Sequence, residues 1–153
     1  MKPQKGSNLL RKGRASIKNQ HYLLTTTEID REPIFYQAEA AEIVLDSLHW
    51  LETQEKIILD AAVVMPEHLH FVAGLKQGSL AQLMRSLKSY SAKKINVLLQ
   101  RQGPLWQSQY HDHAVRTDED LKELVLYTLQ NPVRAGLVED FHDYPHWYCR
   151  WKV

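Results

Sequence analysis

Two apolar segments separated by a three-residue interruption restrict the folds open to this chain more than any other feature. Residues 56–64 are rich in β-branched and apolar side chains, and residues 68–75 alternate between polar and apolar ones. Between them stands Met65-Pro66-Glu67, and proline is largely confined to the ends and edges of strands. The pattern therefore predicts two neighbouring antiparallel strands.

Helical periodicity on either side of this pair supplies the other predicted elements. Apolar residues recur at spacings of three and four over 37–53, after a β-prone segment at 21–27. Ser79 can cap a second helix that ends before Gly103-Pro104, and 106–116 is predicted to contain a fourth strand. Thr117 begins a T-D-E-D capping box, which predicts a third helix over 118–131.

The resulting order, β-α-β-β-α-β-α, predicts an α+β fold. A ferredoxin-like sandwich is its simplest arrangement, with an antiparallel four-stranded sheet, helices on one face and an additional C-terminal helix. The other face is then available for a site. We expect a flexible basic arm over 1–20, one folded domain over 21–140, and a C-terminal tail over 141–153 that seals the domain edge.

Composition favours an ordinary globular protein. A single cysteine among 153 residues allows no internal disulfide, which suits a reducing cytoplasm, and no apolar run approaches the roughly 20 residues that cross a bilayer. We therefore expect a cytoplasmic protein without a membrane partner. Net charge is only +1, yet residues 1–18 and 76–101 carry basic side chains and no acidic ones. Such segments either bind phosphates or are simply solvated.

His68 and His70 form a candidate metal site. Because side chains alternate across a strand, both imidazoles belong to one face and Leu69 and Phe71 to the other. Neutral imidazole is a common transition-metal ligand. The alternative is a pair of partly exposed sheet histidines. His111 and His113 form a second, less regular pair, and Glu67 is either a further ligand, a general base or a solvated turn residue.

Seven tyrosines compete for a catalytic role, and most tyrosines in a small domain serve packing. Tyr127 lies on the margin of the apolar stripe of the third predicted helix. Asn131 follows one turn later on the same face. A phenol and an amide oxygen can therefore approach the sheet together, although position alone selects none of the seven.

Three segments together carry a resemblance to a known family. VVMPEHLHFV, WQSQYHDHAVR and YTLQNPVRAGLV occur in the order and spacing typical of the IS200-like tyrosine transposases, also called HUH transposases. The sequence especially resembles their REP-associated branch over roughly 21–140. The resemblance implies that 21–140 is a catalytic domain and that the third helix is catalytic. His68 and His70 would be metal ligands, Tyr127 the nucleophile, and Asn131 a further ligand where relatives often have glutamine.

The activity that this resemblance implies is cleavage and joining of single-stranded or hairpin DNA through a 5′-phosphotyrosine, assisted by Mg²⁺ or Mn²⁺. Candidate DNA contacts are basic or aromatic side chains, namely Arg85, Lys88, Lys93, Trp106, Arg116 and Arg134. Trp106 is equally suited to the core. Two alternatives stay open: a hydrolase that activates water at the histidines, and a DNA-binding relative without activity. The sequence leaves open whether the active unit is a monomer or a homodimer.

Overall fold

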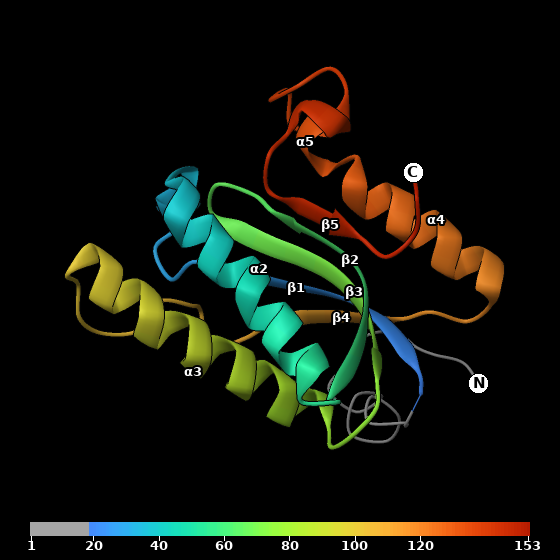
Figure 1. Cartoon of the computed structure of the whole chain (residues 1–153), viewed down its shortest axis with the longest axis horizontal. Helices are drawn as coiled ribbons and strands as arrows, with labels where there is room; N and C mark the ends of the chain where they lie inside the picture. The colour runs from blue at the N-terminus through green and yellow to red at the C-terminus, as the bar shows by residue number, and fades with distance from the viewer. Residues whose placement is uncertain (1–18) are drawn as a thin grey trace.

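The computed structural model describes residues 19–153 (Figure 1). The arm expected over 1–20 lies outside the described residues except for Asn19 and Gln20. These two residues border the sheet, because Asn19 donates its backbone N–H to the Leu75 carbonyl and the Gln20 carbonyl accepts from Leu75. Within 19–153, no helix combines the length and apolarity needed to cross a membrane.

A five-stranded antiparallel sheet forms the centre of the fold, in the order β4-β1-β3-β2-β5 (Figure 1). Its strands are β1 His21–Thr27, β2 Ile57–Val64, β3 His68–Leu75, β4 His111–Ala114 and β5 Trp147–Cys149. The expected count of four strands is wrong, because β5, within the expected C-terminal tail, pairs with the free edge of β2. The predicted strand within 106–116 is reduced to β4, while Trp106 makes only an isolated bridge with Glu28.

Two long helices cover one face of the sheet, α2 Ala38–Thr53 and α3 Leu80–Leu99, with the short 3₁₀ turn η1 Ile34–Tyr36 leading into α2 (Figure 1). Ser79 caps α3 as predicted: its side chain accepts from the Gln82 N–H, and the Gln82 side chain accepts from the Ser79 N–H. The main core lies between these helices and the inward-facing residues of the strands, among them Leu24, Leu69 and Phe71.

A second, smaller core occupies part of the opposite face, so helices lie on both faces of the sheet (Figure 1). Here α4 Asp118–Leu129 packs on β2 and β3, followed by α5 Asn131–Arg134 and the 3₁₀ turn η2 Phe141–Asp143. Thr117 caps α4 by accepting from the Asp120 N–H, which is one half of the expected capping box. The helix predicted over 118–131 ends at Leu129, and Asn131 instead begins α5.

One buried carboxylate ties three segments of the sheet together. Asp60 is fully buried at a shift in the β2–β3 register, and its Oδ2 lies 2.6 Å from His21 Nδ1 on β1. Its Oδ1 accepts from Arg150 Nη2 at 2.8 Å, just beyond β5, and the Arg150 backbone N–H donates to the Asp60 carbonyl at 2.8 Å. These bonds hold the C-terminal segment against the sheet edge.

Candidate active site

His68 and His70 lie together on the face of the sheet that carries α4. Leu69 and Phe71 belong to the main core and Val72 to the smaller one, so the residues of β3 alternate between faces as predicted. The two imidazole rings are perpendicular, with centroids 4.5 Å apart. Both side chains are partly buried. Two imidazoles this close can bind one ion.

The Nδ1 atom of each ring already has a neighbour. His70 Nδ1 is 2.8 Å from Oγ1 of Thr25, the residue opposite it on β1, and His68 Nδ1 is 3.4 Å from Glu67 Oε2. Both neighbours can accept a proton from a neutral imidazole. In that tautomer the Nε2 lone pair of each ring is available to a ligand.

The surroundings keep both rings neutral at physiological pH. Burial, together with the His68 and Arg134 charges, lowers the pKa of His70 to about 3. Burial also lowers the pKa of His68, although the neighbouring Glu67 carboxylate acts in the opposite direction. Neutral imidazole is the form that binds metal ions, so the rings are ready for one without losing a proton.

Tyr127 and Arg134 come from the α4–α5 region, on the same face of the sheet as the histidines. Tyr127 lies near the end of α4, with 51% of its surface exposed. The Arg134 guanidinium stacks on the Tyr127 ring, 3.8 Å from its centroid, and donates to the Tyr127 carbonyl at 2.8 Å. The Arg134 charge also lowers the pKa of His70, so this arginine contacts the tyrosine and acts electrostatically on the histidine pair. The site therefore presents an exposed phenol, a cation and two imidazoles on one side of the sheet.

Asn131 and Thr128 add two buried polar groups from the same helical region. Asn131 Nδ2 and Thr128 Oγ1 are buried and have no hydrogen-bond partner. Buried polar groups are nearly always paired, so such an amide is suited to a ligand. A half-turn of the Asn131 amide presents its oxygen, a donor suited to Mg²⁺ or Mn²⁺. The ligand types of His68, His70 and Asn131, two imidazole nitrogens and one amide oxygen, are compatible with a divalent ion.

The second histidine pair lies at the sheet edge. His111 is opposite Thr25 in the β4–β1 register, and Thr25 is opposite His70, so His111 shares the face of the first pair but stands two strands away. His111 and His113 are both exposed. Within residues 19–153, no cluster of three or more histidine, cysteine or acidic side chains is close enough to hold a metal. A third protein ligand for the first pair would therefore have to be another kind of side chain, and the Asn131 amide stays the predicted candidate.

A model of the family described as "Transposase IS200 like" matches residues 16–128. This span includes both histidines and Tyr127, and covers well over half of the chain. The chain belongs to the IS200-like transposase family. Asn131 lies just beyond the matched residues, so family membership alone does not assign its role.

Individual relatives of this IS200-like protein are REP-associated tyrosine transposases, as the resemblance implied. The chain is 29% identical to one from Escherichia coli K12 over 89 residues, covering 57% of this chain and 51% of the relative. It is 26% identical over 100 residues to a Haemophilus influenzae protein described as a candidate for the same class, covering 56% and 55%. The matches thus span about half the length of these curated relatives.

The fold is also that of a solved family structure. The structure of a REP-associated tyrosine transposase bound to a REP hairpin superposes with a TM-score of 0.74 at 23% identity. The alignment covers 88% of this chain and 79% of the other. At this identity the likeness establishes the fold alone.

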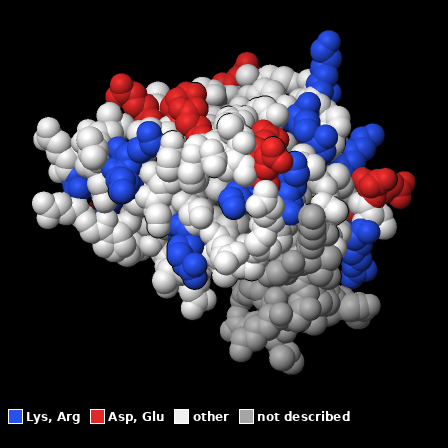
Figure 2. All heavy atoms as spheres, turned by 60° about the horizontal axis from the view of Figure 1, so that its bottom comes forward, with Lys and Arg blue, Asp and Glu red and all other residues white. Residues whose placement is uncertain are grey.

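The predicted DNA contacts have different surroundings. Arg85, Lys93 and Arg116 are exposed, whereas Lys88 is partly buried. Lysine and arginine side chains are spread over the face shown in Figure 2, and acidic side chains appear only in the upper half of that view.

Trp106 lies in the core, so of its two predicted roles, core packing and stacking on a base, the structure supports core packing. Its side chain is 5% exposed, its ring stacks on Phe35 with centroids 5.2 Å apart, and its Nε1 donates to Ser91 Oγ at 3.0 Å. Both the ring face and the polar atom are therefore engaged inside the protein.

Sequence reasoning missed two residues beside the histidines. Thr25 contacts His70 across the β1–β3 register, and the Arg31 charge acts on His68. Arg31 has a positive φ of 59° in the turn after β1. The fully buried Glu28 carboxylate holds this turn, because it accepts hydrogen bonds from the backbone N–H groups of Asp30 and Glu32, both at 2.7 Å. A known strand register would have identified Thr25, and a single sequence contains no direct signal for it.

Proposed function

We propose that this IS200-like protein cleaves and rejoins single-stranded DNA, including strands beside hairpins, with Tyr127 as the nucleophile. The supporting observation is the arrangement in which Arg134 lies over the Tyr127 ring while its charge reaches His70. A phenol, a cation and a candidate metal site thus lie on one face of the sheet, where a phosphate would be bound.

The chemistry of the step follows from these groups. Tyr127 Oη attacks phosphorus, the bond from phosphorus to the 3′ oxygen breaks, and a 5′-phosphotyrosine forms. The phenol proton passes to solvent, and the departing 3′ oxygen takes up a proton. Because the phosphodiester is conserved as a tyrosyl ester, attack by another 3′-hydroxyl reverses the step and joins strands without ATP.

His68, His70 and Asn131 would hold Mg²⁺ or Mn²⁺, with the two imidazoles favouring Mn²⁺. When bound, the ion would polarise the scissile phosphate and stabilise the charge that develops on its oxygens. In our proposal Thr25 and Glu67 accept the Nδ1 protons, which directs Nε2 of both histidines toward the site. Arg134 binds a phosphate oxygen and orients the phenol.

A DNA hairpin is the proposed partner, by analogy with the relative whose structure contains a REP hairpin. Arg85, Lys88, Lys93 and Arg116 would contact phosphates. Because α4 packs on the sheet of its own chain, the proposed site lies within one chain. A homodimer of such chains would then carry two complete sites.

The test is formation of a covalent DNA–protein adduct. The parent protein is incubated with a labelled hairpin carrying single-stranded flanks and Mn²⁺, and products are separated under denaturing conditions. We expect a labelled adduct from the parent and none from Tyr127→Phe. Tyr90→Phe is the matched control, because Tyr90 stacks on Trp50 on the far side of the sheet, and it should form the adduct like the parent.

Other outcomes select the alternatives. Metal-dependent cleavage that persists in Tyr127→Phe without an adduct would identify a hydrolase that uses activated water. Tight hairpin binding by the parent without cleavage under any divalent ion would identify a DNA-binding relative. Either result overturns the tyrosine mechanism.

A further inference from the structure

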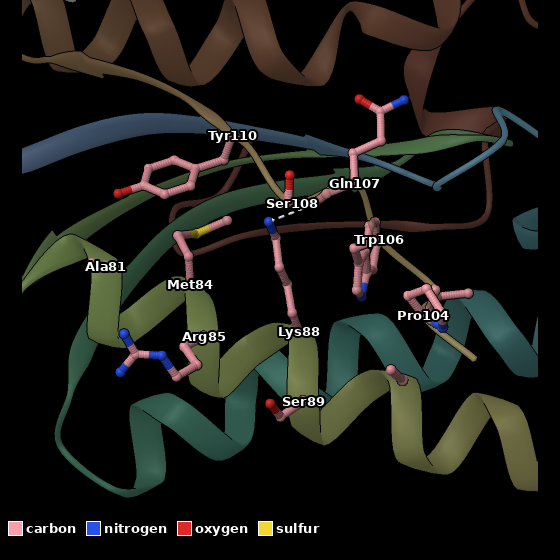
Figure 3. A pocket seen from close by; sticks show the side chains of 12 residues that line it. Ala81, Met84, Arg85, Lys88, Ser89, Pro104, Trp106, Gln107, Ser108 and Tyr110 are labelled. Atoms are coloured by element: carbon pink, nitrogen blue, oxygen red, sulfur yellow. Dashed lines mark hydrogen bonds between the residues drawn. The ribbon is translucent and has the colours of Figure 1, made fainter. Parts of the chain in front are cut away.

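A groove of about 550 Å³ lies between α3 and the 104–110 segment that leads into β4 (Figure 3). Its size is within the roughly 300–1,000 Å³ typical of small-molecule sites. Met84 and Trp106 contribute apolar surface, Tyr110 stands at one end, and Arg85 and Lys88 come from α3 (Figure 3). This groove is on the side of the sheet covered by α2 and α3, away from the face that carries His68 and His70.

Charge in the groove is unbalanced. The Lys88 side chain crosses from α3 to the opposite segment, where its ammonium donates to the Gln107 carbonyl at 2.7 Å (Figure 3). It also donates to the Gln109 carbonyl at 3.3 Å. Burial lowers the pKa of Lys88. Arg85 adds a second positive charge, and none of the described residues that line the groove is acidic. A partly desolvated cation without a carboxylate is stabilised by a bound anion.

The uncharged lining is suited to a flat, aromatic group. Tyr110 is partly buried against the main core, and Met84 lies beside it in the groove (Figure 3). A base that stacks on an aromatic side chain beside lysine or arginine is the usual arrangement in proteins that bind single strands. The Ser108 hydroxyl is a polar group in the lining that can contact the edge of a base.

We propose that this groove binds one unpaired nucleotide of the single-stranded DNA that flanks the cleaved hairpin. The base would stack on Tyr110, and Arg85 and Lys88 would contact its phosphate. The inference rests on the proposed function for its ligand, but it concerns a site distinct from the catalytic one.

The sheet edge connects the two sites. Tyr110 packs toward the main core on the α3 side, while the next residue, His111, begins β4 and shares the face of His70 through Thr25. β4 is an edge strand, so a DNA strand can cross it from the tyrosine site to the groove without passing through the protein. The groove would thus fix which part of a flank lies at Tyr127.

The experiment measures binding without cleavage. Full-length protein carrying Tyr127→Phe is titrated in EDTA against three labelled hairpins: one blunt, one with a short 5′ flank and one with a short 3′ flank. We expect one of the two flanks to increase the affinity of the protein for the hairpin, compared with the blunt probe. Tyr110→Ala should lower affinity for that probe by roughly 5- to 150-fold, the loss produced when one base–aromatic stack is removed. Binding of the blunt hairpin should not change, and Tyr110→Phe should preserve the gain.

Three further variants separate the contribution of the groove from that of general charge and from misfolding. Arg85→Ala should weaken binding of the flanked probe and lower its salt slope by about one. Lys94→Ala is the matched control on the same helix, since Lys94 lies over the Tyr90 ring 5.0 Å from its centroid and outside the groove. Ala81→Trp fills the groove from an exposed helix position and should abolish the gain even if Tyr110→Ala fails to fold.

Equal affinity of the protein for blunt and flanked hairpins would overturn the proposal. The proposal would also be overturned if Ala81→Trp kept the full gain in affinity from the flank. An equal loss of affinity for all three probes in Tyr110→Ala would overturn it as well. Because no cleavage is measured, absence of the adduct in the Tyr127 assay would count against the proposed chemistry and not against this groove.

Discussion

Replacement of Thr25 by valine tests how the histidine pair is oriented. Thr25 Oγ1 lies 2.8 Å from His70 Nδ1 across the β1–β3 register. Valine keeps the β-branched shape that suits a strand and has a methyl group in place of the hydroxyl. Without it, His70 loses the group that accepts its Nδ1 proton, and the tautomer with Nε2 free for a metal is no longer favoured.

The size of the effect follows from the geometry. Loss of a hydrogen-bond partner behind a metal ligand typically weakens metal binding 10- to 100-fold. We expect the lower end, about 10-fold, because the Thr25 hydroxyl is uncharged and His68 keeps its Glu67 carboxylate at 3.4 Å. A neutral hydrogen bond is worth roughly 0.5–1.5 kcal/mol in stability, so the fold should persist.

Two measurements examine this directly. Titration with Mn²⁺ gives the affinity, and ¹⁵N chemical shifts of the His70 ring in the metal-free protein report the tautomer. Thr27→Val is the matched control, since Thr27 is opposite His68 on the same strand and face. Thr25→Ser should restore both readouts. Unchanged Mn²⁺ affinity and an unchanged His70 tautomer in Thr25→Val would refute the argument.

Three further predictions concern the fold. Asp60→Asn removes the charge shared by His21 and Arg150, and should lower the free energy of unfolding by about 1.5–3 kcal/mol in urea denaturation; an unchanged midpoint would contradict this. Thr117→Ala removes the α4 cap and should cost about 1 kcal/mol, seen as a lower melting temperature. The pKa of His70 falls from 6.5 to about 3 on folding, so the unfolded chain takes up this proton first. The free energy of unfolding should therefore decrease as pH drops from 6.5 toward 3, by up to about 1.4 kcal/mol per pH unit, and His70→Gln should remove that part of the slope.

Elements with strong local signals were predictable from the sequence. The helix over 37–53 and the Ser79 cap depend on side chains within one or two turns, and the structure has both almost as expected. Strand β5 was missed because three residues in an aromatic-rich tail carry little local preference, and their pairing with β2 joins residues far apart in the chain. The break at Gln130 was misplaced because Pro132, which disfavours a helix interior, is tolerated in the first turn of α5.

The site was predictable to the extent that it follows from alternation along one strand. The facing of His68 and His70 needs only the two-residue period of β3, whereas the Thr25 contact needs the partner strand and its register. Trp106 could not be assigned between core and surface, because its burial depends on Phe35 and Ser91 from distant elements.

The same alternation separates stability from chemistry along β3. Leu69 and Phe71 are fully buried in the main core, while His68 and His70, which alternate with them, face the candidate site. Truncation of Phe71 would leave a cavity and cost about 3–5 kcal/mol, enough to threaten folding of a small domain. Replacement of His70 instead removes a ligand from a partly buried surface and leaves that core intact. Neighbouring positions on one strand can therefore change independently, so the sheet can keep its core while the histidine face changes its ligands.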